Sequence, residues 1–227
     1  ARAAMKEGVA GLERFSVRLM RPVMPMLAQP AADAESALAA LGEALLEWKL
    51  DGARVQVHKD GDRTCVSTRT LKDVTGAVPE VVAAARDARA RTLILDGEAI
   101  ALRPDGKPRP FQDTMRRFGR KQDDEAMRRE LPLSVFFFDC LLADDEVLMD
   151  APLRRRREVL ERAVIPAHLT PAKASADVGE ATAFYADALA HGHEGIMAKS
   201  LAAPYEAGSR GASWLKVKKA HTLDLVV

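Results

Sequence analysis

Residues 47–54, Glu-Trp-Lys-Leu-Asp-Gly-Ala-Arg, contain the pattern that decides how the fold of this chain is interpreted. Lys49 stands in an apolar strand-like run, one residue before an Asp-Gly turn, with an acid and an arginine close by. A lysine at its ordinary pKa of about 10.4 is a poor nucleophile at neutral pH. Desolvation or neighbouring cations lower a lysine pKa and free the lone pair of the amine. The octet therefore predicts either a nucleophilic lysine or a strand-edge lysine that reaches solvent.

The sequence on either side of the octet has the period of β-strands. Apolar residues at 45–50 lead into Asp51-Gly52, and Val55 and Val57 alternate with polar residues before a second Asp-Gly. This pattern predicts a hairpin-rich β segment. Strands are also expected at 92–102, 194–200 and 214–219. Residues 133–142 (LSVFFFDCLL) are nearly all apolar and predict a buried central strand.

Helices are predicted between these strands. Asp33 can cap a short helix that ends near Gly42. Further helices are expected at 79–89, 111–129, 152–164 and 179–190. The whole pattern predicts an α+β fold of mixed, mostly antiparallel sheets flanked by helices. The segment 21–30 carries three prolines, which favour an extended linker or a strap across a domain surface.

Length and composition set the limits of this prediction. A chain of 227 residues suffices for one large domain or two small ones. With 48% hydrophobic and 30% charged residues it can bury a sizeable core, which excludes intrinsic disorder as the main state. No apolar run approaches ~20 residues, so no membrane span is predicted. Cys65 and Cys140 cannot form a disulfide framework, and a reducing cytoplasm is the simplest setting.

Six segments, in order along the chain, resemble the motifs of the covalent nucleotidyltransferases, which comprise polynucleotide ligases and mRNA capping enzymes. The octet resembles their nucleotide-accepting motif. The other five are STRTLKDVT at 67–75, LDGE at 95–98, FFFD at 136–139, EGIMAK at 194–199 and WLKVK at 214–218. Residues 25–28, 110–112 and 152–156 resemble, more narrowly, ATP-dependent DNA ligases of bacterial and archaeal type. The resemblance implies a nucleotidyltransferase (ATP-grasp-like) domain at residues 22–219.

The resemblance also implies a role for each matching residue. Lys49 would attack the α-phosphorus of ATP and hold AMP as a phosphoramidate. Glu98 and Glu194 would hold Mg²⁺ or Mn²⁺, since carboxylates and phosphates share this ion in phosphoryl transfer. Phe138 would stack on the purine. The nucleotide-binding residues would be Glu47, Trp48, Arg54, Arg69, Glu98, Phe138, Met197, Lys199, Lys216 and Lys218.

Nicked duplex DNA is the second substrate that the resemblance implies. The resemblance also implies an enzyme of the cytoplasm, associated with the nucleoid and not with a membrane. Residues 1–21 would be the tail of a preceding DNA-binding domain, and residues 220–227 the start of a following OB-fold domain that is otherwise absent. Residues 103–129 carry nine Lys or Arg against five acids. Arg154 to Arg157 form a cationic run at a helix start, which predicts a phosphate partner or a nearby acid.

Other functions remain open at this point. An RNA ligase or a capping enzyme has related motifs, and the capping enzyme would use GTP. NAD-dependent ligases share K-x-D-G, but nothing upstream resembles their nicotinamide-binding domain. A catalytically silent DNA-clamping module would keep the arginines and would not need Lys49. No Lys or Arg follows Lys219, so residues 1–227 are expected to bind ATP but to adenylate more slowly than a longer enzyme.

Overall fold

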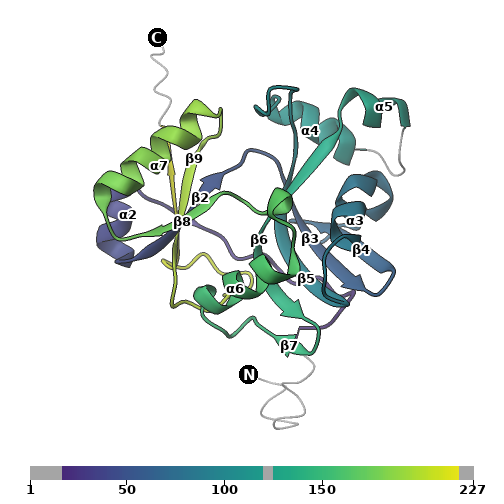
Figure 1. Ribbon diagram of the computed structural model, residues 1–227, viewed down its shortest axis with the longest axis horizontal. Coiled ribbons are helices and arrows are strands. Elements are labelled where there is room, and N and C mark those ends of the chain that lie inside the picture. The colour runs from purple at the N-terminus through teal and green to yellow at the C-terminus, as the bar shows by residue number, and fades with distance from the viewer. Residues whose placement is uncertain (1–16, 120–124, 220–227) are drawn as a thin grey trace, which may run out of the picture.

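The computed structural model of the protein describes residues 17–119 and 125–219, which form two five-stranded sheets (Figure 1). The strand orders are β1-β10-β9-β2-β8 in the first sheet and β4-β3-β5-β6-β7 in the second. Neighbouring strands pair antiparallel, except that β1 runs parallel to β10. The predicted α+β fold with mixed, mostly antiparallel sheets is confirmed.

The elements have the following bounds. The first sheet contains β1 (Gln29–Pro30), β2 (Ala44–Lys49), β8 (Ala172–Ser175), β9 (Gly195–Ser200) and β10 (Trp214–Lys218). The second contains β3 (Ala53–Asp60), β4 (Arg63–Thr68), β5 (Thr92–Ala101), β6 (Leu133–Ala143) and β7 (Glu146–Val147). The helices are α2 (Ala34–Leu41), α3 (Pro79–Arg86), α4 (Phe111–Phe118), α5 (Glu125–Glu130), α6 (Leu153–Ala163) and α7 (Val178–Ala190).

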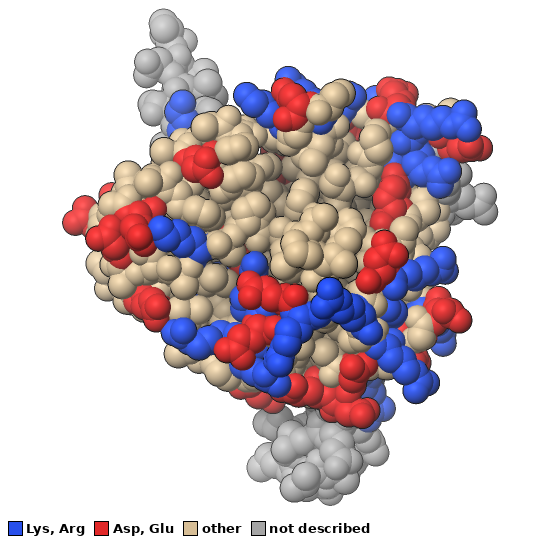
Figure 2. Space-filling view, viewed as in Figure 1, with Lys and Arg blue, Asp and Glu red and all other residues tan. Residues whose placement is uncertain are grey.

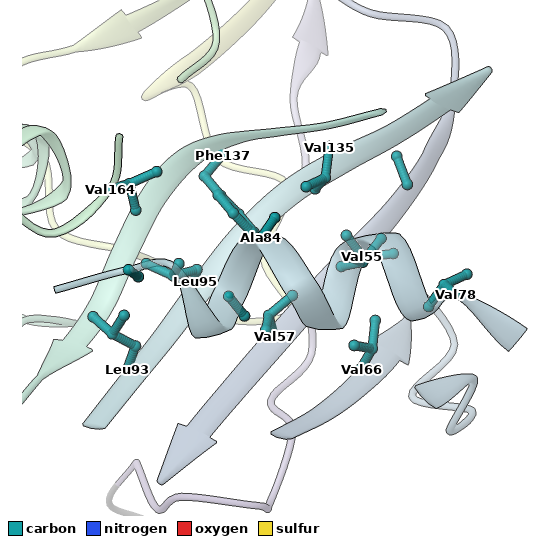
Figure 3. Close-up of a cluster of buried hydrophobic side chains, with 14 of the residues drawn as sticks. Val55, Val57, Val66, Val78, Ala84, Leu93, Leu95, Val135, Phe137 and Val164 are labelled. Atoms are coloured by element: carbon teal, nitrogen blue, oxygen red, sulfur yellow. The ribbon is translucent and has the colours of Figure 1, made fainter. Parts of the chain in front are cut away.

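Helix α3 covers one face of the second sheet and encloses the larger core (Figure 3). The alternation of β3 directs Val55 and Val57 toward this helix, where both are fully buried. Phe137 of β6 is also fully buried there, which confirms the predicted buried strand. Burying a side chain of this kind stabilises a fold by about 1.5–3 kcal/mol.

Helices α2 and α7 lie together on the outer side of the first sheet (Figure 1). Asp33 caps α2 as predicted, since its carboxylate accepts a hydrogen bond of 2.7 Å from the Ser36 amide. Gly42 ends the helix with φ 71°, a left-handed conformation that favours glycine. Helix α2 therefore begins and ends where the sequence signals it. Alanines of α2 and α7 pack in one core with residues of β2 and β9.

The proline-bearing segment is a strap that lies between the sheets and the loop before β10. Met26 is fully buried, and its amide donates a hydrogen bond of 3.0 Å to the Tyr205 hydroxyl. The strap ends in β1, a strand that the sequence did not predict. Strand β8 was also missed, because its sequence Ala-Lys-Ala-Ser has no apolar run. Of the predicted flanking segments 1–21 and 220–227, residues 1–16 and all of 220–227 lie outside the described residues, as do Arg120 and Lys121.

Candidate functional site

Lys49 lies where the chain leaves the first sheet and enters the second. It is the last residue of β2, and β3 begins at Ala53 after the turn that contains Asp51 and Gly52. A Cβ atom on Gly52 would lie 2.3 Å from the Ala99 carbonyl oxygen, so only glycine lets the turn pass this close to β5. The Asp-Gly of the octet therefore has a steric reason, and it sets Lys49 between the sheets.

A pocket of about 630 Å³ opens between the two sheets beside this turn. Its volume is in the range of sites that bind small ligands. The predicted site residues that line it are Glu47, Trp48, Lys49, Arg54, Arg69, Glu98, Phe138, Met197, Lys199 and Lys216. Glu194 is outside the lining, but its carboxylate accepts a hydrogen bond from the Lys49 ammonium. Lys218 is exposed at the end of β10 and does not line the pocket.

Positive charges gather at one side of the pocket. Burial lowers the pKa of Lys216, and the charges of Lys49 and Arg210 lower it further. Arg210 was not singled out from the sequence, although it lines the pocket and donates a hydrogen bond of 3.2 Å to the Ala28 carbonyl. The sequence signal that could have identified Arg210 is its position six residues before Lys216, in the loop that leads into β10. This crowding of cations favours an anionic ligand.

Arg54 extends from β3 into the pocket and is held by three partners. Its guanidinium donates hydrogen bonds of 2.6 Å to the Met26 carbonyl, 2.7 Å to Asp96 and 3.2 Å to the Tyr205 hydroxyl. The same group lies 5.3 Å from the centre of the Phe138 ring. The orientation of Arg54 in the pocket is therefore fixed by the strap, by Asp96 of β5 and by the loop that follows β9.

Glu98 is the carboxylate of the second sheet that faces the pocket. Burial raises its pKa to about 7, against the opposing effect of the Arg54 and Lys49 charges and of a hydrogen bond from the Gly52 amide. Among residues 17–119 and 125–219, no group of three or more His, Cys, Asp or Glu is placed to hold a metal ion. Mg²⁺ commonly uses only one or two protein carboxylates together with substrate phosphates. Glu98 and Glu194 fit that donor set.

The pocket lining also has an aromatic surface. The rings of Phe138 and Trp214 meet edge to face, with centres 6.1 Å apart. The Lys199 ammonium lies 4.3 Å from the Phe138 ring centre and 4.2 Å from that of Trp214. Burial lowers the pKa of Lys199, while its ion pair with Glu47 acts in the other direction. This surface combines flat apolar rings with two cations, the Lys199 ammonium and the Arg54 guanidinium.

The basic runs of the sequence meet acids in the described residues. Arg117 is buried and forms hydrogen bonds of 2.7 and 2.9 Å with Glu80. Figure 2 shows Lys and Arg interspersed with Asp and Glu around the rim of one face, with uncharged residues at its centre. The sequence predicted either a phosphate or a nearby acid as the partner of the arginines at 154–157. In the structure, each of these arginines forms an ion pair with an acid.

Known proteins resemble this chain along most of its length. Residues 25–218 match the family model of the ATP dependent DNA ligase domain. The chain is 63% identical over 227 residues to a probable DNA ligase of Anaeromyxobacter sp. strain Fw109-5. It is 57% identical over 231 residues to a probable DNA ligase of Sorangium cellulosum strain So ce56. Each alignment covers 100% of this chain but only 44% and 42% of the relatives, so the chain spans less than half of their length.

Two solved structures extend the comparison to the fold. A mycobacterial DNA ligase D complexed with ATP and MES superimposes with a TM-score of 0.68 at 26% identity, covering 88% of this chain and 62% of that one. The ligase domain of LigD from M. tuberculosis gives a TM-score of 0.66 at 28% identity, covering 86% and 60%. No helix of the described residues is long and apolar enough to span a membrane. On the match over residues 25–218, the chain belongs to the family of ATP-dependent DNA ligase domains.

Proposed function

We propose that this chain is the adenylating part of an ATP-dependent DNA ligase, with Lys49 as the nucleophile. The observation that carries the proposal is the place of Lys49, at the crossover between the sheets, in a pocket whose lining combines several cations with an aromatic surface. A nucleotide has the complementary parts, a phosphate chain and a flat base. The resemblance of the named relatives points in the same direction.

The first step transfers AMP from ATP to the protein. The neutral Lys49 amine attacks the α-phosphorus and forms an N–P bond. The bond between the α-phosphorus and the bridging oxygen breaks, and its electron pair leaves with pyrophosphate. The Lys49 ammonium, whose side chain is 21% exposed, must first lose a proton to solvent. Its hydrogen bond with Glu194 fixes the position of Nζ at the pocket.

The remaining pocket residues bind and orient ATP. Phe138 and Met197 offer apolar surfaces to the purine. Arg54, Lys199, Lys216 and Arg210 would surround the phosphates and stabilise charge on the non-bridging oxygens. Arg69 at the pocket mouth would meet a phosphate or the DNA end. Trp48 and Glu47 would lie along the adenine, and Lys218 would act only from the rim.

Glu98 and Glu194 would hold Mg²⁺ or Mn²⁺ at the junction of the two sheets. An ion bound there would offset the negative charge of the phosphates during transfer. Neither carboxylate is enclosed by enough protein ligands to bind the ion tightly alone, so ATP would complete the site. Glu98 accepts a hydrogen bond from the Gly52 amide in the turn after Lys49, and a contact with the ribose is the alternative role for this carboxylate.

The AMP would then pass to the 5′-phosphate of nicked duplex DNA, and the 3′-hydroxyl would displace it to seal the strand. These steps belong to the whole protein, for which the relatives' greater length leaves room for further domains. The natural place of such an enzyme is the cytoplasm, in association with the nucleoid.

The test is transfer of nucleotide to the protein. The chain is incubated with Mg²⁺ or Mn²⁺ and either ATP or GTP, each labelled at the α-phosphate, and its intact mass is measured. We expect an AMP adduct from ATP, located on Lys49 by peptide sequencing. A GMP adduct would support a capping-type enzyme instead. No adduct from either nucleotide would contradict the proposal.

A further inference from the structure

Helix α6 carries four consecutive arginines, and they do not share one environment. Arg154 lies 2.9 Å from Glu43, and Arg155 lies 2.8 Å from Glu146; these two pairs are exposed. Where Figure 1 draws α6, charged side chains of both signs lie side by side in Figure 2. The first half of the run is therefore a surface of ordinary ion pairs, which contribute little to stability.

The second half of the run faces inward. The Arg156 guanidinium pairs with Asp139 at 2.8 Å, and both side chains are fully buried. Asp139 directly follows Phe138, so this pair anchors the strand that carries the aromatic surface of the pocket. Arg157 points toward Glu47 of β2, which lines the pocket. Its side chain is 11% exposed, against 58% for Arg154 and 39% for Arg155.

Arg157 connects the helix to Glu47. Its Nη1 lies 3.4 Å from the Glu47 Oε1 atom, and its Nη2 donates a hydrogen bond of 3.3 Å to the Thr170 carbonyl. Glu161, one turn further along the helix, accepts a hydrogen bond of 2.6 Å from Nε of Arg157. Three contacts thus fix the guanidinium behind the pocket, where it does not line the cavity.

The Glu47 carboxylate is shared between two cations. One oxygen, Oε1, faces Arg157, and the other, Oε2, is ion-paired with Lys199. Glu47 and Lys199 are 2% and 1% exposed, so water screens neither of them. Charges interact more strongly in such a buried site than at the surface. The attraction that Glu47 exerts on Lys199 therefore depends on how much of its charge Arg157 balances.

We propose that Arg157 is a positioning residue for Lys199, acting through Glu47. With Arg157 in place, Glu47 holds Lys199 in line with the pocket and leaves its charge available to a ligand phosphate. Without Arg157, the unbalanced carboxylate would hold the Lys199 ammonium more tightly and would lose the support of its Oε1 atom. This proposal rests on the proposed function and goes beyond it, because Arg157 does not itself line the nucleotide pocket and reaches it only through Glu47 and Thr170.

The test compares Arg157→Met with Arg155→Met, a control on the same helix with the same change of charge. Single-turnover adenylation and ATP binding are measured for both. We expect Arg157→Met to slow adenylation by about 10- to 100-fold, the loss typical when an orienting partner behind a site is removed. Binding of ATP should weaken by a smaller factor. Arg155→Met should stay within about twofold of the unmodified chain, because exposed pairs contribute little.

A double-mutant cycle separates positioning from general loss of structure. In a Glu47→Gln background, Arg157→Met should not slow adenylation further, because the Glu47 carboxylate through which Arg157 acts is already absent. Arg157→Lys keeps the charge without the planar fork and should lose less than Arg157→Met. If Arg157→Met fails to fold, the same cycle is run with Arg157→Lys.

The outcomes separate the two proposals. Equal rates for Arg157→Met and Arg155→Met, or losses that multiply independently of Glu47→Gln, would overturn the role of Arg157. Failure of the unmodified chain to form any adduct would instead overturn the proposed function.

Discussion

The Lys49 ammonium donates a hydrogen bond to the Glu194 carboxylate, although the two residues are separated by 145 positions in the sequence. The register of the first sheet produces this contact, since Lys49 of β2 is paired with Gly195 of β9. The Glu194 amide also donates a hydrogen bond of 3.2 Å to the Lys49 carbonyl. Backbone and side chain thus fix the candidate nucleophile together, which makes its position a property of the sheet.

Replacement of Lys49 is expected to abolish nucleotide transfer without unfolding the chain. Alanine has no amine, and the side chain of Lys49 lies in the pocket and not in a core. Lys49→Arg should fail as well, because a guanidinium stays protonated at any working pH. Transfer of labelled AMP from ATP measures the effect, with circular dichroism as the check on folding. Labelling that survives either substitution would show that another residue is the nucleophile.

Removal of the two carboxylates is expected to affect the rate more than the binding of ATP. Glu98→Ala and Glu194→Ala should each slow adenylation by at least about tenfold, while the dissociation constant of ATP changes less. The reason is that a metal ion held by these groups mainly offsets charge that develops during transfer. Titrating Mg²⁺ against each variant provides the measurement. If Glu98→Ala weakens ATP binding but leaves the rate of adenylation at saturating ATP unchanged, Glu98 contacts the ribose and not the metal.

Most of the fold was predictable because its signals are local. The Asp33 cap, the Gly42 terminus and the apolar run of β6 each lie within a few residues of the element that they define. Strands β1 and β8 were missed because they exist only through pairing with β10 and β2, far away in the sequence. Their own residues carry no alternation that distinguishes them from loops.

The site was predictable to the extent that family motifs name residues. The structure brings most of these residues to one pocket, with Glu194 and Lys218 outside its lining. The buried partners were not predictable, because Arg156 and Arg157 look like solvated residues in a run of four arginines. What distinguishes them is that they form ion pairs with Asp139 of β6 and Glu47 of β2, both far away in the sequence. Such pairing depends on tertiary packing that sequence spacing does not encode.

The Tyr205 hydroxyl is expected to stabilise the strap. It accepts a hydrogen bond of 3.0 Å from the buried Met26 amide and donates one to Asp96. Tyr205→Phe leaves that amide without its partner, so the free energy of unfolding should fall by about 1–3 kcal/mol. Tyr185→Phe, which removes a hydroxyl from a partly exposed side chain of α7, is the control. Urea denaturation of both variants gives the comparison, and equal stability of the two would show that the hydroxyl does not anchor the strap.

His58 is expected to make the fold sensitive to acid. It is fully buried in β3, its Nε2 lies 3.1 Å from the Gln56 Oε1 atom, and burial lowers its pKa from 6.5 to about 4 although Asp96 opposes the shift. Between these pH values the unfolded chain binds a proton that the folded chain does not, so stability is lost as the pH falls from 6.5 towards 4. At 1.36 kcal/mol per pKa unit this loss approaches about 3 kcal/mol.

His58→Gln should remove this part of the pH dependence, because glutamine does not titrate. The free energy of unfolding is measured by urea denaturation at neutral pH and near the lower limit of the window. We expect the unmodified chain to lose more stability between the two than His58→Gln does, by about 3 kcal/mol at most. The control is Thr182→Gln, since Thr182 is an exposed position of α7 and its replacement neither adds nor removes a titrating group. Parallel curves for the unmodified chain and His58→Gln would mean that His58 is protonated without loss of the fold, and its buried neutral state would have to be abandoned.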